Sequence, residues 1–199
     1  MLFARLRMPP NRITVLWALL GIIGVIALGW PSYFVRVAGA VLLQISYLLD
    51  YVDGEVARLL QRSSKRGFLL DLLGHGVIKA GLFLAVGYRQ FLTTQQAASL
   101  LLAFVASASL VNVYALPFLA AHAGVRNQPA PSGNQSGASG RRGALRELLG
   151  LLGLLFESPG LYALVLITVL SNKIGLLLLF YGILTPLWLL WRVQKYRFE

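Results

Sequence analysis

The sequence predicts an all-α integral membrane protein with six transmembrane helices and both termini in the cytoplasm. Composition, charge placement and long apolar runs predict it. Of 199 residues, 57% are hydrophobic and only 13% are charged. A soluble domain has about a quarter of its residues charged, so the composition excludes a water-soluble enzyme. The chain has no cysteine, which excludes disulfides, thiolate catalysis and cysteine-bound metal centres.

Six apolar stretches are the candidate spans, because about 20 helical residues cross a hydrocarbon layer of about 30 Å. They cover residues 13–31, 33–57, 67–88, 94–121, 158–172 and 173–191. The first stretch follows a basic N-terminal end and superficially resembles a secretory signal. Further long apolar runs follow it, so we expect a retained anchor.

The basic residues predict the orientation of these spans. The net charge is +11, and most lysines and arginines lie in the segments that an even number of spans places on one side. By the positive-inside rule this side is cytoplasmic, and we expect a multi-pass protein of the plasma (inner) membrane. The basic residues interrupt apolar runs instead of forming one stripe, which argues against a nucleic-acid partner.

The chain is expected to form a single domain, residues 1–199. Residues 123–143 are rich in Gly, Ser, Pro, Asn and Gln and predict a flexible cytoplasmic loop within it. The apolar segment 144–156 is too short to cross a membrane, so we expect a short interfacial helix before the fifth span.

The second and third spans contain ionisable residues that are costly in a membrane. Asp50, Asp53, Asp71, His75 and Lys79 all fall within or at the edge of these spans. Such groups cost at least about 2.5 kcal/mol each on insertion scales, and they normally face a protein-lined cavity or a partner. These positions are therefore the first candidates for a functional site.

Helical spacing gathers these groups. Asp50 and Asp53 share one helix face with Gly54 and Ala57, and Gly67, Asp71 and His75 follow at four-residue steps on the next span.

If the two helices form an antiparallel pair, residues at equal depth oppose one another. This register places Asp50 opposite His75 and Asp53 opposite Asp71. It also places Ala57 opposite Gly67, where small side chains allow close backbone approach.

Carboxylates that converge in a low-dielectric site need a neutralising cation. Oxygen ligands favour Mg²⁺, Ca²⁺ or Mn²⁺, and Mg²⁺ is commonly shared between carboxylates and substrate phosphates. A basic group at the cytoplasmic rim suits a phosphate-bearing headgroup. Its members are Arg58, Arg62, Lys65 and Arg66.

The pattern Asp50-x-x-Asp53-Gly54-x-x-Ala57-Arg58, then eight residues and Gly67-x-x-x-Asp71-x-x-x-His75, resembles the CDP-alcohol phosphotransferase signature DxxDGxxAR…GxxxDxxxD. All spacings agree. The resemblance extends to six helices with cytoplasmic ends and to an Asn-x-x-Thr stretch, here Asn11 to Thr14. At the fourth aspartate, which the family uses as general base and metal ligand, this chain has His75.

The resemblance assigns roles position by position. Asp50, Asp53 and Asp71 would bind the metal, and His75 would be the general base or a further ligand. The nucleotide and its phosphates would be bordered by Gly54, Ala57, Arg58 and Gly67. Contacts with the acceptor or headgroup would come from Arg62, Lys65, Arg66 and Lys79.

The activity implied is transfer of a phosphatidyl or phospho-alcohol group from a CDP-alcohol to a polar alcohol, with release of CMP. The implied cofactor is Mg²⁺ or Mn²⁺, the donor CDP-diacylglycerol, the role phospholipid synthesis, and the assembly a homodimer. The soluble and lipid partners could also be exchanged, and the acceptor is not readable.

Two alternatives stay open. A non-catalytic relative would bind a cytidine nucleotide or lipid headgroup, with His75 marking lost turnover. A cation transporter would also place carboxylates in the membrane. Individual residues have structural explanations as well: His75 could only fix the helices, Lys79 could snorkel, and the basic loop could only orient the protein.

Overall fold

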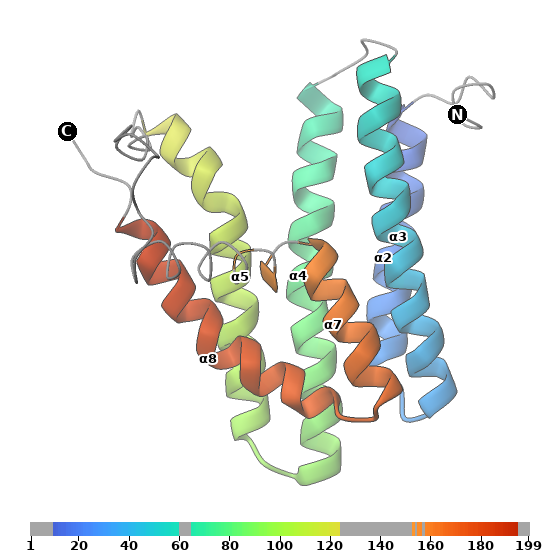
Figure 1. Cartoon of the computed structure of the whole chain (residues 1–199), viewed down its shortest axis with the longest axis vertical. Helices are drawn as coiled ribbons and strands as arrows, with labels where there is room; N and C mark the ends of the chain where they lie inside the picture. The colour runs from blue at the N-terminus through green and yellow to red at the C-terminus, as the bar shows by residue number, and fades with distance from the viewer. Residues whose placement is uncertain (1–9, 60–64, 124–152, 154, 157, 195–199) are drawn as a thin grey trace, which may run out of the picture.

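The structure is a computed structural model that describes residues 10–59, 65–123, 153, 155, 156 and 158–194. In this part of the chain all regular structure is α-helical. The helices are α2 (Pro10–Leu28), α3 (Tyr33–Leu59), α4 (Lys65–Thr94), α5 (Ala98–His122), α7 (Ser158–Leu170) and α8 (Ile174–Val193). In Figure 1, α2, α3 and α4 run side by side, and α8 crosses α5 and α4 obliquely.

The helices have the lengths and surfaces of a multi-pass membrane protein. By length and composition, four stretches are able to cross a membrane: Tyr33–Val56, Gly67–Thr94, Ala98–Ala121 and Ile174–Val193. The other two apolar helices, α2 and α7, are shorter. Large apolar side chains cover the outside of the bundle, among them Phe34 at 80% exposed. Lipid accommodates such a surface, whereas water does not. Six spans and cytoplasmic termini remain predictions.

One predicted boundary is wrong. The third helix was expected to end at residue 88 and the fourth to begin at 94, but α4 continues to Thr94 and α5 begins at Ala98. A charge at Arg89 does not interrupt a helix, because the backbone hydrogen bonds continue through it. The helix ends where Gln95 adopts a left-handed conformation, with φ of 57°.

Helix α2 is the central packing partner of the site helices, because it packs against both α3 and α4. The α2–α3 contact depends on a glycine pair. A Cβ added at Gly24 would lie 2.9 Å from the carbonyl oxygen of Gly39, and one at Gly39 would lie 2.7 Å from that of Gly24. Small residues of this kind let membrane helices approach closely. The two backbones are therefore held at a distance that larger side chains would not permit.

The expected close packing of the α3 and α4 backbones is not observed among the described residues. Among the described residues these two helices make few or no close backbone contacts with each other, whereas each contacts α2. The expected approach of the backbones at Ala57 and Gly67 stays a prediction, because the side chain of Ala57 lies outside the described residues. Close backbone approach is instead made by α2, which meets α3 at Gly24 and Gly39.

A polar clamp joins the ends of the helices away from the acidic residues. The buried guanidinium of Arg36 donates to the Pro31 carbonyl (2.8 Å) and to Asn172 Oδ1 (2.9 Å). Asn172 lies between α7 and α8 with φ of 54°, a conformation that asparagine tolerates well. The Tyr33 hydroxyl donates to the Leu170 carbonyl. The clamp connects the start of α3 to the α7–α8 turn.

Two predicted segments lie mostly or wholly outside the described residues. The expected flexible loop, residues 123–143, is described only at Ala123. In the expected interfacial segment 144–156, Gly153, Leu155 and Phe156 are described and helical. Phe156 stacks on Trp188 of α8, with ring centroids 5.1 Å apart. This part of the segment therefore packs on the bundle.

Candidate active site

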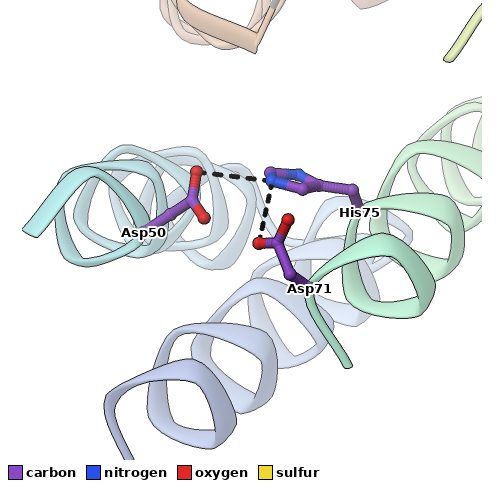
Figure 2. A group of neighbouring side chains, drawn as sticks. All are labelled: Asp50, Asp71 and His75. Atoms are coloured by element: carbon purple, nitrogen blue, oxygen red, sulfur yellow. Dashed lines mark ion pairs between the residues drawn. The ribbon is translucent and has the colours of Figure 1, made fainter. Parts of the chain in front are cut away.

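Two carboxylates and one imidazole converge between α3 and α4 (Figure 2). His75 Nε2 lies 3.4 Å from Asp50 Oδ2 and 3.6 Å from Asp71 Oδ1. One ligand atom from each residue lies within 4.8 Å of the others. The predicted register is confirmed for Asp50 and His75, which face one another across the helices. Asp71 joins them because it lies one turn before His75 on α4.

Asp53 lies outside this group of three. Its Oδ2 accepts a hydrogen bond from the Thr14 hydroxyl of α2, and its Oδ1 is buried without a hydrogen-bond partner. The side chain is about nine-tenths buried. An unpaired buried carboxylate oxygen is costly unless a cation or donor reaches it. Asp53 is thus held by α2 through Oδ2, while Oδ1 lacks a hydrogen-bond donor among the described residues.

Two aromatic rings pack against the imidazole of His75. The Trp17 ring lies 4.9 Å from it and the Tyr114 ring 5.2 Å from it, between centroids. Gly74 makes room for the tryptophan, because a Cβ there would lie 2.6 Å from the indole. The other ring nitrogen, Nδ1, is buried without a hydrogen-bond partner. The aromatic contacts and the two carboxylates near Nε2 together position the ring.

Lys79 continues the same face of α4, one turn beyond His75. Its side chain is only 2% exposed, and its Nζ lies 3.9 Å from the centroid of the Tyr114 ring. This is a cation–π contact, which gains strength when the cation is shielded from water. The lysine side chain is therefore buried inside the bundle.

The residues predicted to contact the nucleotide and its phosphates are partly or fully exposed, or have side chains outside the described residues. Arg58 is exposed and donates to Glu55 at 2.8 Å, one turn earlier on α3. A Cβ at Gly54 would lie 3.6 Å from the Arg58 guanidinium, so this guanidinium lies close to the Gly54 backbone. Gly67 lies in the first turn of α4. Arg62 and the side chains of Ala57, Lys65 and Arg66 lie outside the described residues.

Three of the residues that contact the site were not assigned to it from the sequence. Thr14 appeared only as part of an Asn-x-x-Thr stretch, and Trp17 and Tyr114 appeared as ordinary apolar positions. The spacing of Thr14 and Trp17, one helical turn apart, places both on one face of α2. Tyr114 carries no comparable signal, because it belongs to a different helix and reaches His75 only in the folded bundle.

The donor set fits a divalent cation. Asp50 and Asp71 offer carboxylate oxygens, and His75 offers an imidazole nitrogen. Asp53, three residues after Asp50 on α3, has a buried oxygen without a hydrogen-bond partner. Mn²⁺ and Mg²⁺ accept carboxylate ligands, and imidazole is a common metal ligand. The described residues could therefore bind a metal.

Comparison with known proteins identifies the family. A sequence model of CDP-alcohol phosphatidyltransferase matches residues 7–188. A curated protein of Aquifex aeolicus (strain VF5), "Bifunctional IPC transferase and DIPP synthase", is 45% identical over 62 residues. That alignment covers 31% of this chain and 14% of the relative, so it concerns a small part of a much longer protein. Because the family match spans nearly all of the helical bundle described above, the chain belongs to the CDP-alcohol phosphatidyltransferase family.

Proposed function

We propose that this protein transfers a phosphatidyl or phospho-alcohol group from a CDP-alcohol, CDP-diacylglycerol in the first instance, to a polar alcohol and releases CMP. One observation carries the proposal: Asp50, Asp71 and His75, three positions of the family signature, converge within 4.8 Å. The Aquifex relative, whose name describes a transferase and a synthase, supports the reaction class. The pathway would be phospholipid synthesis.

The carboxylates of Asp50 and Asp71 would hold the divalent ion, Mg²⁺ or Mn²⁺, and Asp53 would complete the set through its unpaired oxygen. When bound, such an ion neutralises the diphosphate and polarises the phosphoryl oxygens. Thr14 fixes the Asp53 carboxylate by donating to Oδ2. Trp17 and Tyr114 fix the imidazole of His75. These contacts pre-organise the site, so little reorganisation is needed when substrate binds.

The nucleotide is expected at the ends of α3 and α4. Gly54, Ala57 and Gly67 would border it, and Arg58 would contact its phosphates by exchanging its exposed partner Glu55 for them. This exchange is inexpensive, because an exposed ion pair contributes about 0–1 kcal/mol. Contacts with the acceptor or headgroup are proposed for Arg62, Lys65, Arg66 and Lys79.

Release of CMP tests the proposal. Purified protein in detergent or nanodiscs would be incubated with CDP-diacylglycerol, a panel of polar alcohols and alcohol phosphates, and Mg²⁺ or Mn²⁺. CDP-ethanolamine or CDP-choline with diacylglycerol would test the exchanged arrangement. Folded protein that releases no CMP with any donor and either ion contradicts the proposal.

Two carboxylate variants sharpen this test. Asp71→Asn should lower the rate of CMP release at least about a hundredfold, because even residues around a metal ligand commonly contribute 10- to 100-fold. Glu55→Gln removes an exposed carboxylate from the neighbouring α3 segment and should retain most of the rate. Equal losses in both variants would indicate a general effect of charge instead of a metal site.

The substitution at position 75 favours a second candidate, a relative that binds CDP-alcohols without turnover. Metal-dependent binding of a CDP-alcohol without CMP release would favour it. A cation transporter is less well supported, because the acidic residues of the described helices all lie at one end of α3 and α4. Ion flux in proteoliposomes would distinguish it.

The location and assembly are proposals as well. The basic residues favour a site that faces the cytoplasm from the plasma membrane, and accessibility labelling of an engineered cysteine near the α3 end would test this. The homodimer that the resemblance implies would be tested by the mass of the protein in detergent.

A further inference from the structure

We propose that His75 acts as a metal ligand through Nε2 and not as the general base, and that this nitrogen shifts the site from Mg²⁺ towards Mn²⁺ and other first-row transition ions. This role deepens the proposed function and rests on it. The ion preference of the site then follows from one substitution in the signature.

The separations around His75 suit a shared ion. Nε2 lies 3.4 Å from Asp50 Oδ2 and 3.6 Å from Asp71 Oδ1. Two atoms that bind one ion at about 2.1 Å lie about 3 Å apart at right angles and about 4 Å apart when opposite. The same nitrogen is directed at both carboxylates, as Figure 2 shows. Ligation therefore requires only small movements of these side chains.

The other nitrogen of the ring is badly placed for proton transfer. Nδ1 is buried without a hydrogen-bond partner. The ring packs against Trp17 and Tyr114, with centroids 4.9 and 5.2 Å away. A general base must come within hydrogen-bond reach of the acceptor hydroxyl. An imidazole that ligates through Nε2 has only Nδ1 left for this task, and Nδ1 is enclosed by protein.

The exchange of a carboxylate for an imidazole changes ion preference for two reasons. Mg²⁺ prefers oxygen ligands, whereas transition ions accept imidazole nitrogen readily. A neutral imidazole also contributes less negative charge than a carboxylate, so a purely electrostatic Mg²⁺ site is weakened. Restoring the carboxylate at this position should therefore favour Mg²⁺ again.

Mn²⁺ is the probe for the experiment. The full chain in detergent would be titrated with Mn²⁺ and competed with Mg²⁺ while free Mn²⁺ is followed by electron paramagnetic resonance. The same samples would be examined for coupling between Mn²⁺ and the ligand nitrogen by pulsed spectroscopy. Wild type should show nitrogen coupling, which changes on labelling with ¹⁵N-histidine.

Three variants provide the comparison. His75→Asp should lose the nitrogen coupling and should lower the preference for Mn²⁺ over Mg²⁺ at least about tenfold, equal to about 1.4 kcal/mol. Gln96→Glu adds the same negative charge at an exposed position between α4 and α5 and should keep both properties. His75→Asn, similar in size and uncharged, replaces the aspartate variant if that protein does not fold.

The outcomes separate this inference from the proposed function. Absence of nitrogen coupling in wild type, or an unchanged ion preference in His75→Asp, overturns the ligand role. If CMP is released in that case, the proposed function survives and the base role returns. Nitrogen-coupled Mn²⁺ without CMP release from any donor supports the ligand role while contradicting the transferase proposal.

Discussion

Replacing Thr14 by valine should destabilise the site through Asp53. The threonine hydroxyl donates to Asp53 Oδ2, while Oδ1 of the same carboxylate has no partner. Valine has nearly the same shape but no donor. In Thr14→Val, Oδ2 of a carboxylate about nine-tenths buried would therefore lose its hydrogen-bond donor.

The magnitude follows from the kind of hydrogen bond that is lost. A hydrogen bond to a charged group contributes about 1.5–3 kcal/mol, and about 1.4 kcal/mol corresponds to a factor of ten. The free energy of unfolding should fall by this amount, out of about 5–15 kcal/mol for a typical protein. The rate of CMP release should fall about tenfold or more, because Asp53 is no longer fixed.

Thermal unfolding in detergent and the CMP assay would measure both effects. Thr14→Ser keeps the hydroxyl and should retain most of the stability and activity. A double-mutant cycle with Asp53→Asn isolates the contact. In the asparagine background, Thr14→Val should cost only what a neutral hydrogen bond contributes, about 0.5–1.5 kcal/mol. The same cost in both backgrounds would refute the assigned interaction.

Four further single substitutions test the packing. Gly24→Ala should lower the free energy of unfolding by about 1–3 kcal/mol, because its Cβ would lie 2.9 Å from a carbonyl oxygen of α3. Gly76→Ala, with nothing within 4 Å of the new Cβ, should be neutral or stabilising in the same melts. Gly74→Ala should displace the indole of Trp17, which would lie 2.6 Å from the new Cβ, and should weaken Mn²⁺ binding because Trp17 packs on His75. Adding Trp17→Phe should restore part of the Mn²⁺ binding. Arg36→Met should lower the melting temperature while leaving the KM for the CDP donor unchanged, because its contacts lie at the other end of the bundle.

The sequence predicted the helices well, because apolar runs and breaks in them are local properties. The predicted spans 33–57 and 173–191 differ little from α3 and α8. The end of α4 was missed, because the membrane edge suggested by Arg89 is not where the helix terminates. A left-handed Gln95 ends it instead, and nothing in the local pattern indicates that conformation.

For the site, spacing alone placed Asp71 and His75 on one face and brought Asp50 opposite His75, which the distances confirm. Which helix packs beside which was not readable, since each apolar helix offers several faces and lipid is as apolar as a neighbouring helix. Close approach at Gly24 and Gly39 draws α2 into contact with α3. The fold thereby brings Thr14 to Asp53 and Trp17 to His75. The sequence by itself determined which chemical groups the site contains. The packing of α2 and α5 decided which atoms of those groups have hydrogen-bond partners and which are buried against aromatic rings, because these contacts form only between separate helices.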